Sequence, residues 1–192
     1  HYMNEQYIKL YPVCRWAQPA VEAVLGLVKE HAITPDQIAG INVESFDEAV
    51  RLCAMAENTE QAQYSLPFSV AAAALRGTIG INEISETGLK DHDIQAMARK
   101  ISITPNDDFN AVFPRHRIAS ATIKTHDGQR FVSPPTEARG DPEEAVSDDM
   151  IRQKFRTMAG QTCDEQHCQK LENALGNAQD LPDIDALLRL MR

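Results

Sequence analysis

Apolar positions in the first quarter of the chain follow a helical period and then a strand period. Four of them between positions 19 and 31 share one helical face, which predicts a helix over that range. They are Val21, Val24, Leu25 and Val28. Over residues 38–46 apolar and polar positions alternate, which indicates a half-buried strand. Residues 47–55 fit either a short helix or an irregular segment.

The middle of the chain predicts two more helices. Residues 67–75 are apolar on nearly every side, so the pattern indicates a buried helix, and Gly77 is suited to close it in a left-handed cap. Asp91 is suited to cap a second helix, since apolar residues follow it at helical spacing. A strand near residues 101–103, ended by Pro105, comes next.

A β-hairpin and a polar loop follow. Segments 117–124 and 129–132 flank Asp127-Gly128, the pair preferred in a two-residue type I′ turn. Residues 133–144 are rich in proline, glycine and acidic side chains, which predicts a loop.

From Ser147 onward the pattern is helical throughout. Ser147 is suited to cap the first of three predicted helices, at residues 147–158, 164–175 and 183–191. The order of elements predicts an α+β fold, with a small antiparallel-leaning sheet and helices on one face, followed by an all-helical C-terminal segment. We expect an α+β domain over residues 1–145 and the helical segment over residues 146–192.

Composition narrows the classes of function. The 192 residues include 43% hydrophobic and 24% charged residues, and the net charge of −9 argues against nucleic acid or an anionic membrane as a partner. No apolar run has the length of a membrane span. The four cysteines follow no disulfide scaffold, so we expect reduced thiols and a cytoplasmic location.

We expect neither a metal nor an organic cofactor. Cys163 and His167 would share one helical face, with Cys168 about 100° further round, whereas a structural zinc site needs four ligands. No phosphate-binding glycine loop is present either.

The segment from Lys9 to Pro19 carries the densest candidate chemistry. Pro12 disfavours the helical conformation for the residue before it, and Pro19 suits the first turn of a helix. A lysine, a cysteine and an arginine (Lys9, Cys14, Arg15) therefore lie on a stiff segment that feeds a helix. Such a cation can bind an anionic ligand, or it can be an ordinary solvated surface lysine.

Four motifs together resemble the C-terminal domain of the MmgE/PrpD family. They are Lys9-x-Tyr-Pro-x-Cys-Arg15, Ser65-Leu-Pro-Phe68 with its alanine-rich helix, Gly140-Asp141-Pro142, and Lys154-Phe155-Arg156. The family includes 2-methylcitrate dehydratase, cis-aconitate decarboxylase and iminodisuccinate epimerase. The resemblance implies a lyase or isomerase of small di- or tricarboxylates, such as a dehydratase of propionate metabolism. It also implies a homodimer and an N-terminal helical domain of the same protein, so we expect this chain to be the C-terminal piece of a longer one.

Site residues follow from the resemblance. The family's matching lysine lies in the active-site cleft, so Lys9 is the expected catalytic and substrate-binding residue, with Cys14, Arg15 and Phe68 as further substrate-binding residues. Phe68 stands where many members carry tyrosine, and Gln18 where many carry histidine. These departures leave open a non-catalytic member that serves ligand binding or dimer assembly. The basic cluster at residues 115–117 is either a surface feature or an anion site.

Overall fold

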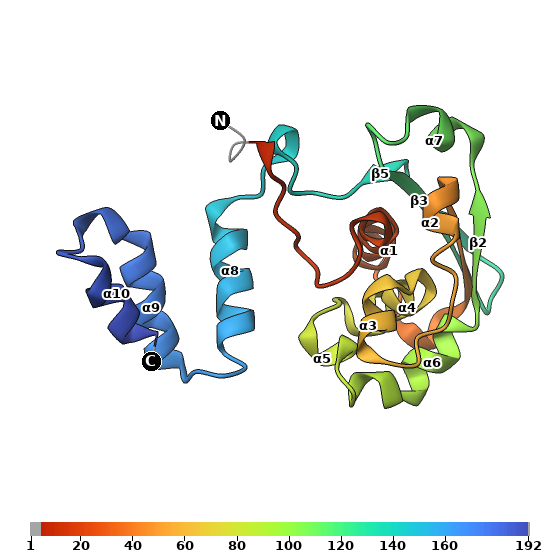
Figure 1. Cartoon of the computed structure of the whole chain (residues 1–192). Helices are drawn as coiled ribbons and strands as arrows, with labels where there is room; N and C mark the ends of the chain where they lie inside the picture. The colour runs from red at the N-terminus through yellow and green to blue at the C-terminus, as the bar shows by residue number, and fades with distance from the viewer. Residues whose placement is uncertain (1–4, 192) are drawn as a thin grey trace. The chain divides into compact units, whose positions relative to one another are not determined.

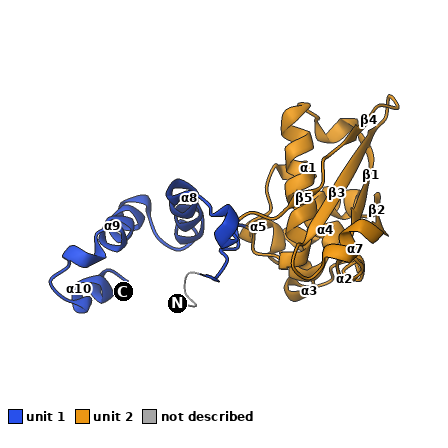
Figure 2. Cartoon of the chain, turned by 90° about the horizontal axis from the view of Figure 1, so that it is seen from above, with its two compact units in different colours: residues 1–10, 140–192 blue, residues 11–139 orange. Residues whose placement is uncertain are grey.

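A computed structural model describes residues 5–191 and divides the chain into two compact units. Unit 1 combines residues 1–10 with residues 140–192, and unit 2 comprises residues 11–139 (Figure 1, Figure 2). Unit 2 is one uninterrupted stretch of sequence. The chain therefore passes from one unit to the other twice, after residue 10 and after residue 139.

Unit 2 is built on a five-stranded mixed sheet. The strands are β1 (Ile38–Ser45), β2 (Ile101–Pro105), β3 (Ile118–Thr125), β4 (Arg130–Val132) and β5 (Thr136–Glu137). Their order is β2-β1-β3-β4, and β5 also pairs with β3. Only β1 and β2 run parallel, and the other pairs are antiparallel, which confirms the predicted α+β class.

Along the chain, the helices of unit 2 precede β1 or connect the strands from β1 to β3. They are the α-helices α1 (Gln18–Glu30), α2 (Asp47–Val50), α3 (Thr59–Tyr64), α4 (Leu66–Arg76), α5 (Ile81–Ile84), α6 (His92–Ala98) and α7 (Asp107–Val112), and the 3₁₀ helices η2 (Arg15–Ala17), η3 (Pro35–Gln37) and η4 (Gly88–Lys90). Helix α1 packs on β3 and α4 packs on β2 (Figure 1). Residues 47–55, which fit two interpretations, contain the short helix α2.

The inner face of the sheet is apolar and its other face is polar. Ile41 and Val43 of β1 and Ile123 of β3 are buried, whereas Glu44 and Lys124 are exposed. This alternation follows from the two-residue period of a strand, and it sets the register of the sheet against the helices.

Helix α1 buries a stripe slightly different from the predicted one. Val21 and Val24 are buried as expected, but Leu27 is the third buried aliphatic residue, and Leu25 and Val28 are only partly buried. Val21, Val24 and Leu27 follow one another at intervals of three residues. With 3.6 residues per turn, this spacing also keeps the three side chains on one side of the helix. The packing of α1 on β3 selects between the two faces.

The predicted buried helix α4 is confirmed. Every residue from Leu66 to Ala74 is buried, and Gly77 closes the helix with φ +69°. At its beginning the Ser65 hydroxyl accepts a hydrogen bond from the Phe68 amide at 3.3 Å. Both ends of the helix are therefore capped by the residue types that the sequence offers.

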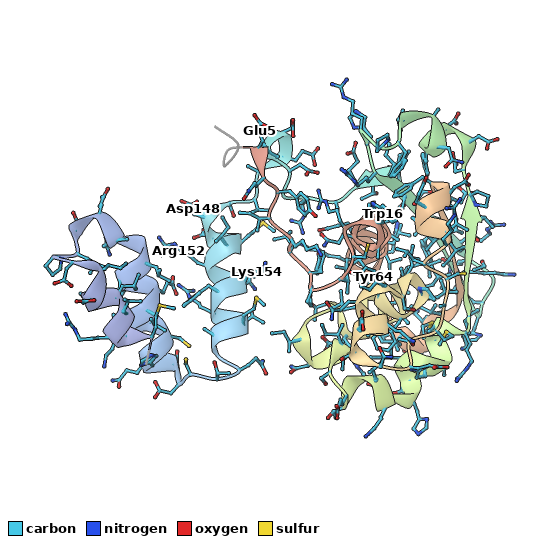
Figure 3. All side chains as sticks on the ribbon, viewed as in Figure 1. Glu5, Trp16, Tyr64, Asp148, Arg152 and Lys154 are labelled. Atoms are coloured by element: carbon cyan, nitrogen blue, oxygen red, sulfur yellow. The ribbon has the colours of Figure 1, made fainter. Side chains whose placement is uncertain are left out.

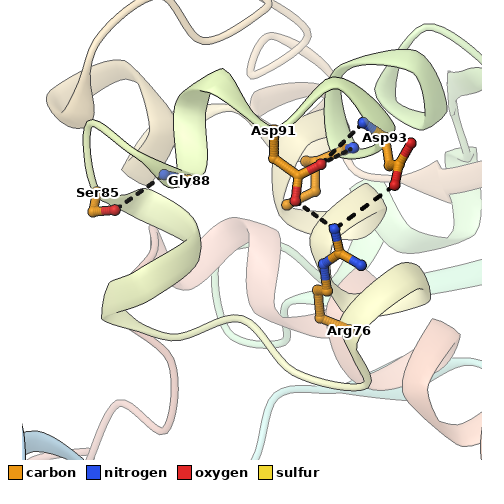
Figure 4. A network of polar contacts seen from close by, with 6 residues as sticks. Arg76, Ser85, Gly88, Asp91 and Asp93 are labelled. Carbon is orange, nitrogen blue, oxygen red and sulfur yellow. Dashed lines mark hydrogen bonds and ion pairs between the residues drawn. The ribbon is translucent and has the colours of Figure 1, made fainter.

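Helix α4 is tied to α6 by an ion pair between Arg76 and Asp91 (Figure 4). Arg76 also lies 4.0 Å from the carboxylate of Asp93. Asp91 caps α6 as predicted, since its Oδ1 accepts from the amides of Asp93 and Ile94 at 2.9 and 3.3 Å. The hydrogen bond from Arg76 holds the pKa of Asp91 below its usual value.

Strands β3 and β4 form the predicted hairpin, but the predicted turn type is wrong. The Gly128 amide donates to the Thr125 carbonyl at 3.0 Å, and the Thr125 amide donates to the Gln129 carbonyl at 3.0 Å, so residues 126–128 form a three-residue loop. Gly128 has φ +89°, but Asp127 does not have the positive φ that type I′ requires. Asp127 instead accepts hydrogen bonds from the Thr125 hydroxyl and the Gln129 side chain.

The segment predicted as a loop, residues 133–144, contains a short strand. Thr136 and Glu137 pair with β3 on the edge that β4 occupies further along. The β4 segment is short and leaves this part of β3 uncovered, so the returning chain completes the pairing.

Every element of unit 1 after residue 147 is a helix, which confirms the prediction for that segment. It contains the 3₁₀ helices η5 (Pro142–Glu144) and η6 (Ala178–Asp180) and the α-helices α8 (Asp148–Ala159), α9 (Glu165–Gly176) and α10 (Ile184–Leu190). The caps are side chains of Ser147, Asp164 and Asp183.

Helices α8 and α9 are held together by ion pairs. Glu172 of α9 is buried and receives hydrogen bonds from Arg156 at 2.6 and 2.7 Å and from Arg152 at 3.2 Å. Arg152 and Lys154 extend from α8 (Figure 3). Helices α8 and α10 contain no buried residue within the described chain, and apolar side chains such as Ile184 remain exposed.

Candidate functional site

The two parts of the N-terminal motif belong to different units. Lys9 is in unit 1, and Cys14 and Arg15 are in unit 2 together with Phe68. The predicted site residues are therefore divided between the two units.

In unit 1 the backbone beside Lys9 is held by the Gly-Asp-Pro turn. The Ile8 amide donates to the Gly140 carbonyl at 2.9 Å, and the Gly140 amide donates to the Glu144 carbonyl at 3.1 Å. Gly140 has φ +105°, and a Cβ atom there would lie 2.2 Å from the Ile8 carbonyl oxygen. Only glycine permits this approach, so the motif residue has a definite structural role.

The Lys-Phe-Arg helix supplies the second support. The ammonium group of Lys154 donates to the main-chain carbonyl of Lys9. The side chain of Lys9 is exposed, and none of the ion pairs formed within residues 5–191 includes it. Two family-like motifs therefore fix the backbone of Lys9 and leave its ammonium group accessible.

In unit 2, Cys14 lies just before η2 and is half-buried. Its amide donates to the carbonyl of Gln63 at 2.6 Å, which joins the N-terminal motif to the end of α3. This bond brings Cys14 next to the segment that leads into the Ser-Leu-Pro-Phe helix. The neighbouring Trp16 packs edge-on against Phe46 and Phe113, with ring centroids 6.2 and 6.1 Å away.

Arg15 is buried and supports the end of unit 2. Its guanidinium group donates to the carbonyl oxygens of Ala138 and Arg139, both at 2.9 Å, and lies 3.4 Å from Gln18 Oε1. A planar group with several donors is suited to hold two carbonyls at once. The two ends of unit 2 are thereby fastened to each other.

The side chain of Gln18 also forms hydrogen bonds inside unit 2. It is 1% exposed, and its Nε2 lies 3.2 Å from the Val13 carbonyl and 3.4 Å from the Tyr11 carbonyl. The amide thus supports the bend around Pro12.

A polar triad of Tyr11, Glu22 and Arg139 was not predicted from the sequence. The Tyr11 hydroxyl donates to Glu22 Oε1 at 3.1 Å, and Arg139 Nε donates to the same oxygen at 3.0 Å. Burial and the neighbouring Glu22 carboxylate raise the pKa of Tyr11 to about 12. One signal in the sequence is Glu22, an acidic residue among the apolar positions of α1. It does not identify the triad, because its partners Tyr11 and Arg139 lie 11 and 117 positions away.

Phe68 has no exposed surface in this structure. It belongs to the apolar core, and its amide is bound by the Ser65 hydroxyl. Its expected role as a substrate-binding residue stays a prediction, and any influence on a ligand would be exerted through the position of α4.

The basic cluster lies at the surface of the sheet. His116 Nδ1 is 3.0 Å from Glu137 Oε1, and both side chains are more than a third exposed. Arg115 and His116 are exposed and Arg117 is half-buried, in agreement with the surface interpretation.

A separate pocket of about 340 Å³ opens beside α3 and η4. It is lined by residues 56–59 with Glu86, Leu89 and Lys90. None of the predicted site residues lines it. Within the described residues, no group of three or more histidine, cysteine or acidic side chains is arranged to hold a metal ion, and no helix is long and apolar enough to cross a membrane.

No curated protein matches this chain significantly. Residues 11–179 match the MmgE/PrpD C-terminal domain, a range that includes Cys14, Arg15, Phe68 and both motifs that support Lys9. Lys9 itself lies two positions before the matched range. The chain therefore belongs to the MmgE/PrpD family and represents its C-terminal domain.

Proposed function

We propose that this domain forms part of a cofactor-independent lyase or isomerase of small polycarboxylates, similar to 2-methylcitrate dehydratase. The reaction begins with removal of a proton α to a carboxylate and ends with loss of water or carbon dioxide, or with reprotonation. The observation that carries the proposal is the accessible ammonium group of Lys9, on a backbone held by Gly140 and Lys154.

Lys9 has the chemistry that such a reaction needs. Negative charge develops on the substrate as the α proton leaves, and a positioned cation stabilises that charge more than water does. A lysine beside a carboxylate of its own protein would be partly neutralised, whereas Lys9 has no such partner among the described residues. In this proposal Lys9 binds a substrate carboxylate and stabilises the enolate-like intermediate.

The other predicted site residues have supporting roles. Cys14 contributes a half-buried thiol to the lining of the site. Arg15 acts as a positioning residue, because its guanidinium group is engaged with two backbone carbonyls. Positioned acids, bases and cations suffice for proton abstraction, so the proposal includes no cofactor.

The proposal includes an N-terminal helical domain that supplies the general acid and base, a homodimer, and a cytoplasmic location with reduced thiols. The exposed apolar side chains of α8 and α10, such as Ile151, Ile184 and Leu188, support the expectation that these helices pack against another domain. All four cysteines are free.

A second candidate is a non-catalytic family member that binds ligands or assembles dimers. The hydrogen bonds that Arg15 and Gln18 donate to main-chain carbonyls of unit 2 favour it, since these groups are engaged within the protein. The phenylalanine at position 68 favours it too, because it removes a hydroxyl that many members have.

The test is the activity of the full-length parent protein on 2-methylcitrate, citrate and cis-aconitate. Loss of the substrate's α-proton signal in deuterated water reports proton abstraction, whichever step follows it. Exchange or turnover with any of the three supports the proposal. Binding of these compounds without exchange favours the second candidate.

A further inference from the structure

Two cysteines of unit 1 occupy positions that face each other across the beginning of a helix. Helix α9 starts at Glu165 and is capped by Asp164, so Cys163 is the residue before the cap and Cys168 is the fourth residue of the helix. Side chains at these two positions regularly contact each other, usually as an apolar pair. Here both carry a thiol.

The backbone holds the two cysteines together. The Cys168 sulfur lies 3.8 Å from the Cys163 carbonyl oxygen, and the Cys168 amide donates to the Asp164 carbonyl at 3.0 Å. The Asp164 side chain accepts from the His167 amide at 2.8 Å, which completes the cap. The turn that carries both thiols is thus closed by three separate contacts.

The two thiols differ in environment. Cys168 is 5% exposed, and burial together with the adjacent Cys163 thiol raises the pKa of Cys168. Cys163 is half-buried, so solvent reaches it more readily. A small oxidant therefore meets Cys163 first, and Cys168 is protected until its neighbour has reacted.

We propose that Cys163 and Cys168 form a reversible disulfide when a hydroperoxide oxidises Cys163. The Cys163 thiolate attacks one oxygen of the peroxide and breaks the O–O bond, which gives a sulfenic acid and, from hydrogen peroxide, hydroxide. The proton that the Cys163 thiol lost on ionisation converts this hydroxide to water. The sulfur of Cys168 then displaces hydroxide from the sulfenic acid, and the proton lost from Cys168 converts that hydroxide to water. The two thiols are oxidised and the peroxide is reduced.

The pair is distinguished from the other cysteines by its neighbourhood. Cys14 and Cys53 belong to unit 2, and neither has a thiol partner in the positions before and within a helix turn. The inference is independent of the proposed function, because it involves neither Lys9 nor the motifs that support it.

The experiment treats the full chain with hydrogen peroxide near stoichiometry, then labels the remaining thiols with N-ethylmaleimide and analyses the peptides by mass spectrometry. The expected result is a fall from four labelled cysteines to two, Cys14 and Cys53. Trypsin leaves Cys163 and Cys168 in one peptide, residues 157–170, and cleavage after Glu165 divides that peptide into fragments that stay linked until dithiothreitol is added.

Two variants separate the roles of the thiols. In Cys168→Ser, dimedone should trap the sulfenic acid on Cys163, whereas in Cys163→Ser the label on Cys168 should persist. Cys53→Ser is the matched control and should form the linked fragments as the unmodified chain does. Retention of all four labels, or linkage of Cys163 to Cys14, Cys53 or a second chain, overturns the proposal.

Discussion

The ammonium group of Lys154 binds the main-chain carbonyl of Lys9 across 145 positions of sequence. One lysine thus fixes the backbone of another and leaves the second side chain accessible. Both residues belong to motifs that resemble the same family, and the contact links the two motifs in this chain. A change at Lys154 should act on the site through the position of Lys9.

Lys9→Ala in the full-length parent should lower turnover far more than stability. Removal of one charge-assisted contact to a developing anion costs about 2–4 kcal/mol in the transition state, which corresponds to a factor of roughly 30 to 1,000 in rate. The measurements are kcat/KM and the melting temperature. Lys29→Ala, at an exposed lysine near the end of α1, is the control and should leave both unchanged. Cys14→Ser should have only a mild effect on either measurement. A wild-type rate in Lys9→Ala would show that Lys9 is an ordinary solvated surface lysine without a role in the reaction.

Arg15→Met should destabilise unit 2. One buried and one partly buried carbonyl would lose their charged donor. Hydrogen bonds of this kind contribute roughly 1.5–3 kcal/mol each, so we expect a loss of about 3 kcal/mol. Urea unfolding measures it. Arg51→Met, at an exposed arginine, is the matched control. An unchanged midpoint in Arg15→Met would mean that the contacts with Ala138 and Arg139 contribute nothing.

Glycine substitutions should have opposite effects at two positions. Gly140→Ala places a Cβ atom 2.2 Å from the Ile8 carbonyl at a positive φ, so it should cost about 2 kcal/mol or more. Gly26→Ala, inside α1 with no atom near the new Cβ, should stabilise by about 0.5–1 kcal/mol. Chemical denaturation of both variants checks the pair. Equal effects would contradict the close approach of Gly140 to Ile8.

The Tyr11 phenol should titrate at a higher pH than an ordinary tyrosine. Its pKa is raised to about 12 by burial and by Glu22, so the protonated phenol stabilises the fold below the ordinary value of 10.0, and this contribution is lost as pH rises through 12. Phenolate absorbance measures the titration. Tyr11→Phe should remove the phase at highest pH, and Tyr64→Phe, at an exposed tyrosine, should retain it. Persistence of that phase in Tyr11→Phe would assign it to another residue.

Acid should weaken the contact between α8 and α9. The hydrogen bond from Arg156 lowers the pKa of Glu172 below its ordinary value of 4.5. The contribution of Glu172 is therefore complete above that value and is lost as pH falls through the lowered pKa. Between about pH 6 and about pH 3, unfolding followed by circular dichroism should show a smaller loss of stability in Glu172→Gln than in wild type. Glu143→Gln, at an exposed position, should behave as wild type does.

Local features were predictable from the sequence because neighbouring residues decide them. Ser147, Asp91 and Gly77 cap helices as predicted, since a cap depends on one side chain and the adjacent backbone. The hairpin was predicted, but its turn type was not, because Asp127 binds its own strand ends through side-chain hydrogen bonds.

Long-range features were not predictable in the same way. The parallel pairing of β1 with β2 and the buried face of α1 depend on which elements pack together. The bond between Arg139 and Glu22 spans 117 positions, so no local pattern signals it. For the same reason the sequence could place Arg15 in a motif but could not show that its guanidinium group holds two carbonyls.

The triad at Glu22 brings the first and last residues of unit 2 together, because Tyr11 and Arg139 bind the same carboxylate oxygen. In unit 1 the Ile8 amide donates a hydrogen bond to the Gly140 carbonyl. The two places where the chain leaves and re-enters unit 1 are therefore also neighbours. Segments with adjacent ends tolerate insertion, excision and circular permutation. Residues 11–139 thus form a cassette. If this cassette is removed, one short peptide linker should rejoin the two segments of unit 1. A second linker should connect residue 139 to residue 11, so that a circular permutant can have its new chain ends at the Asp127-Gly128 turn.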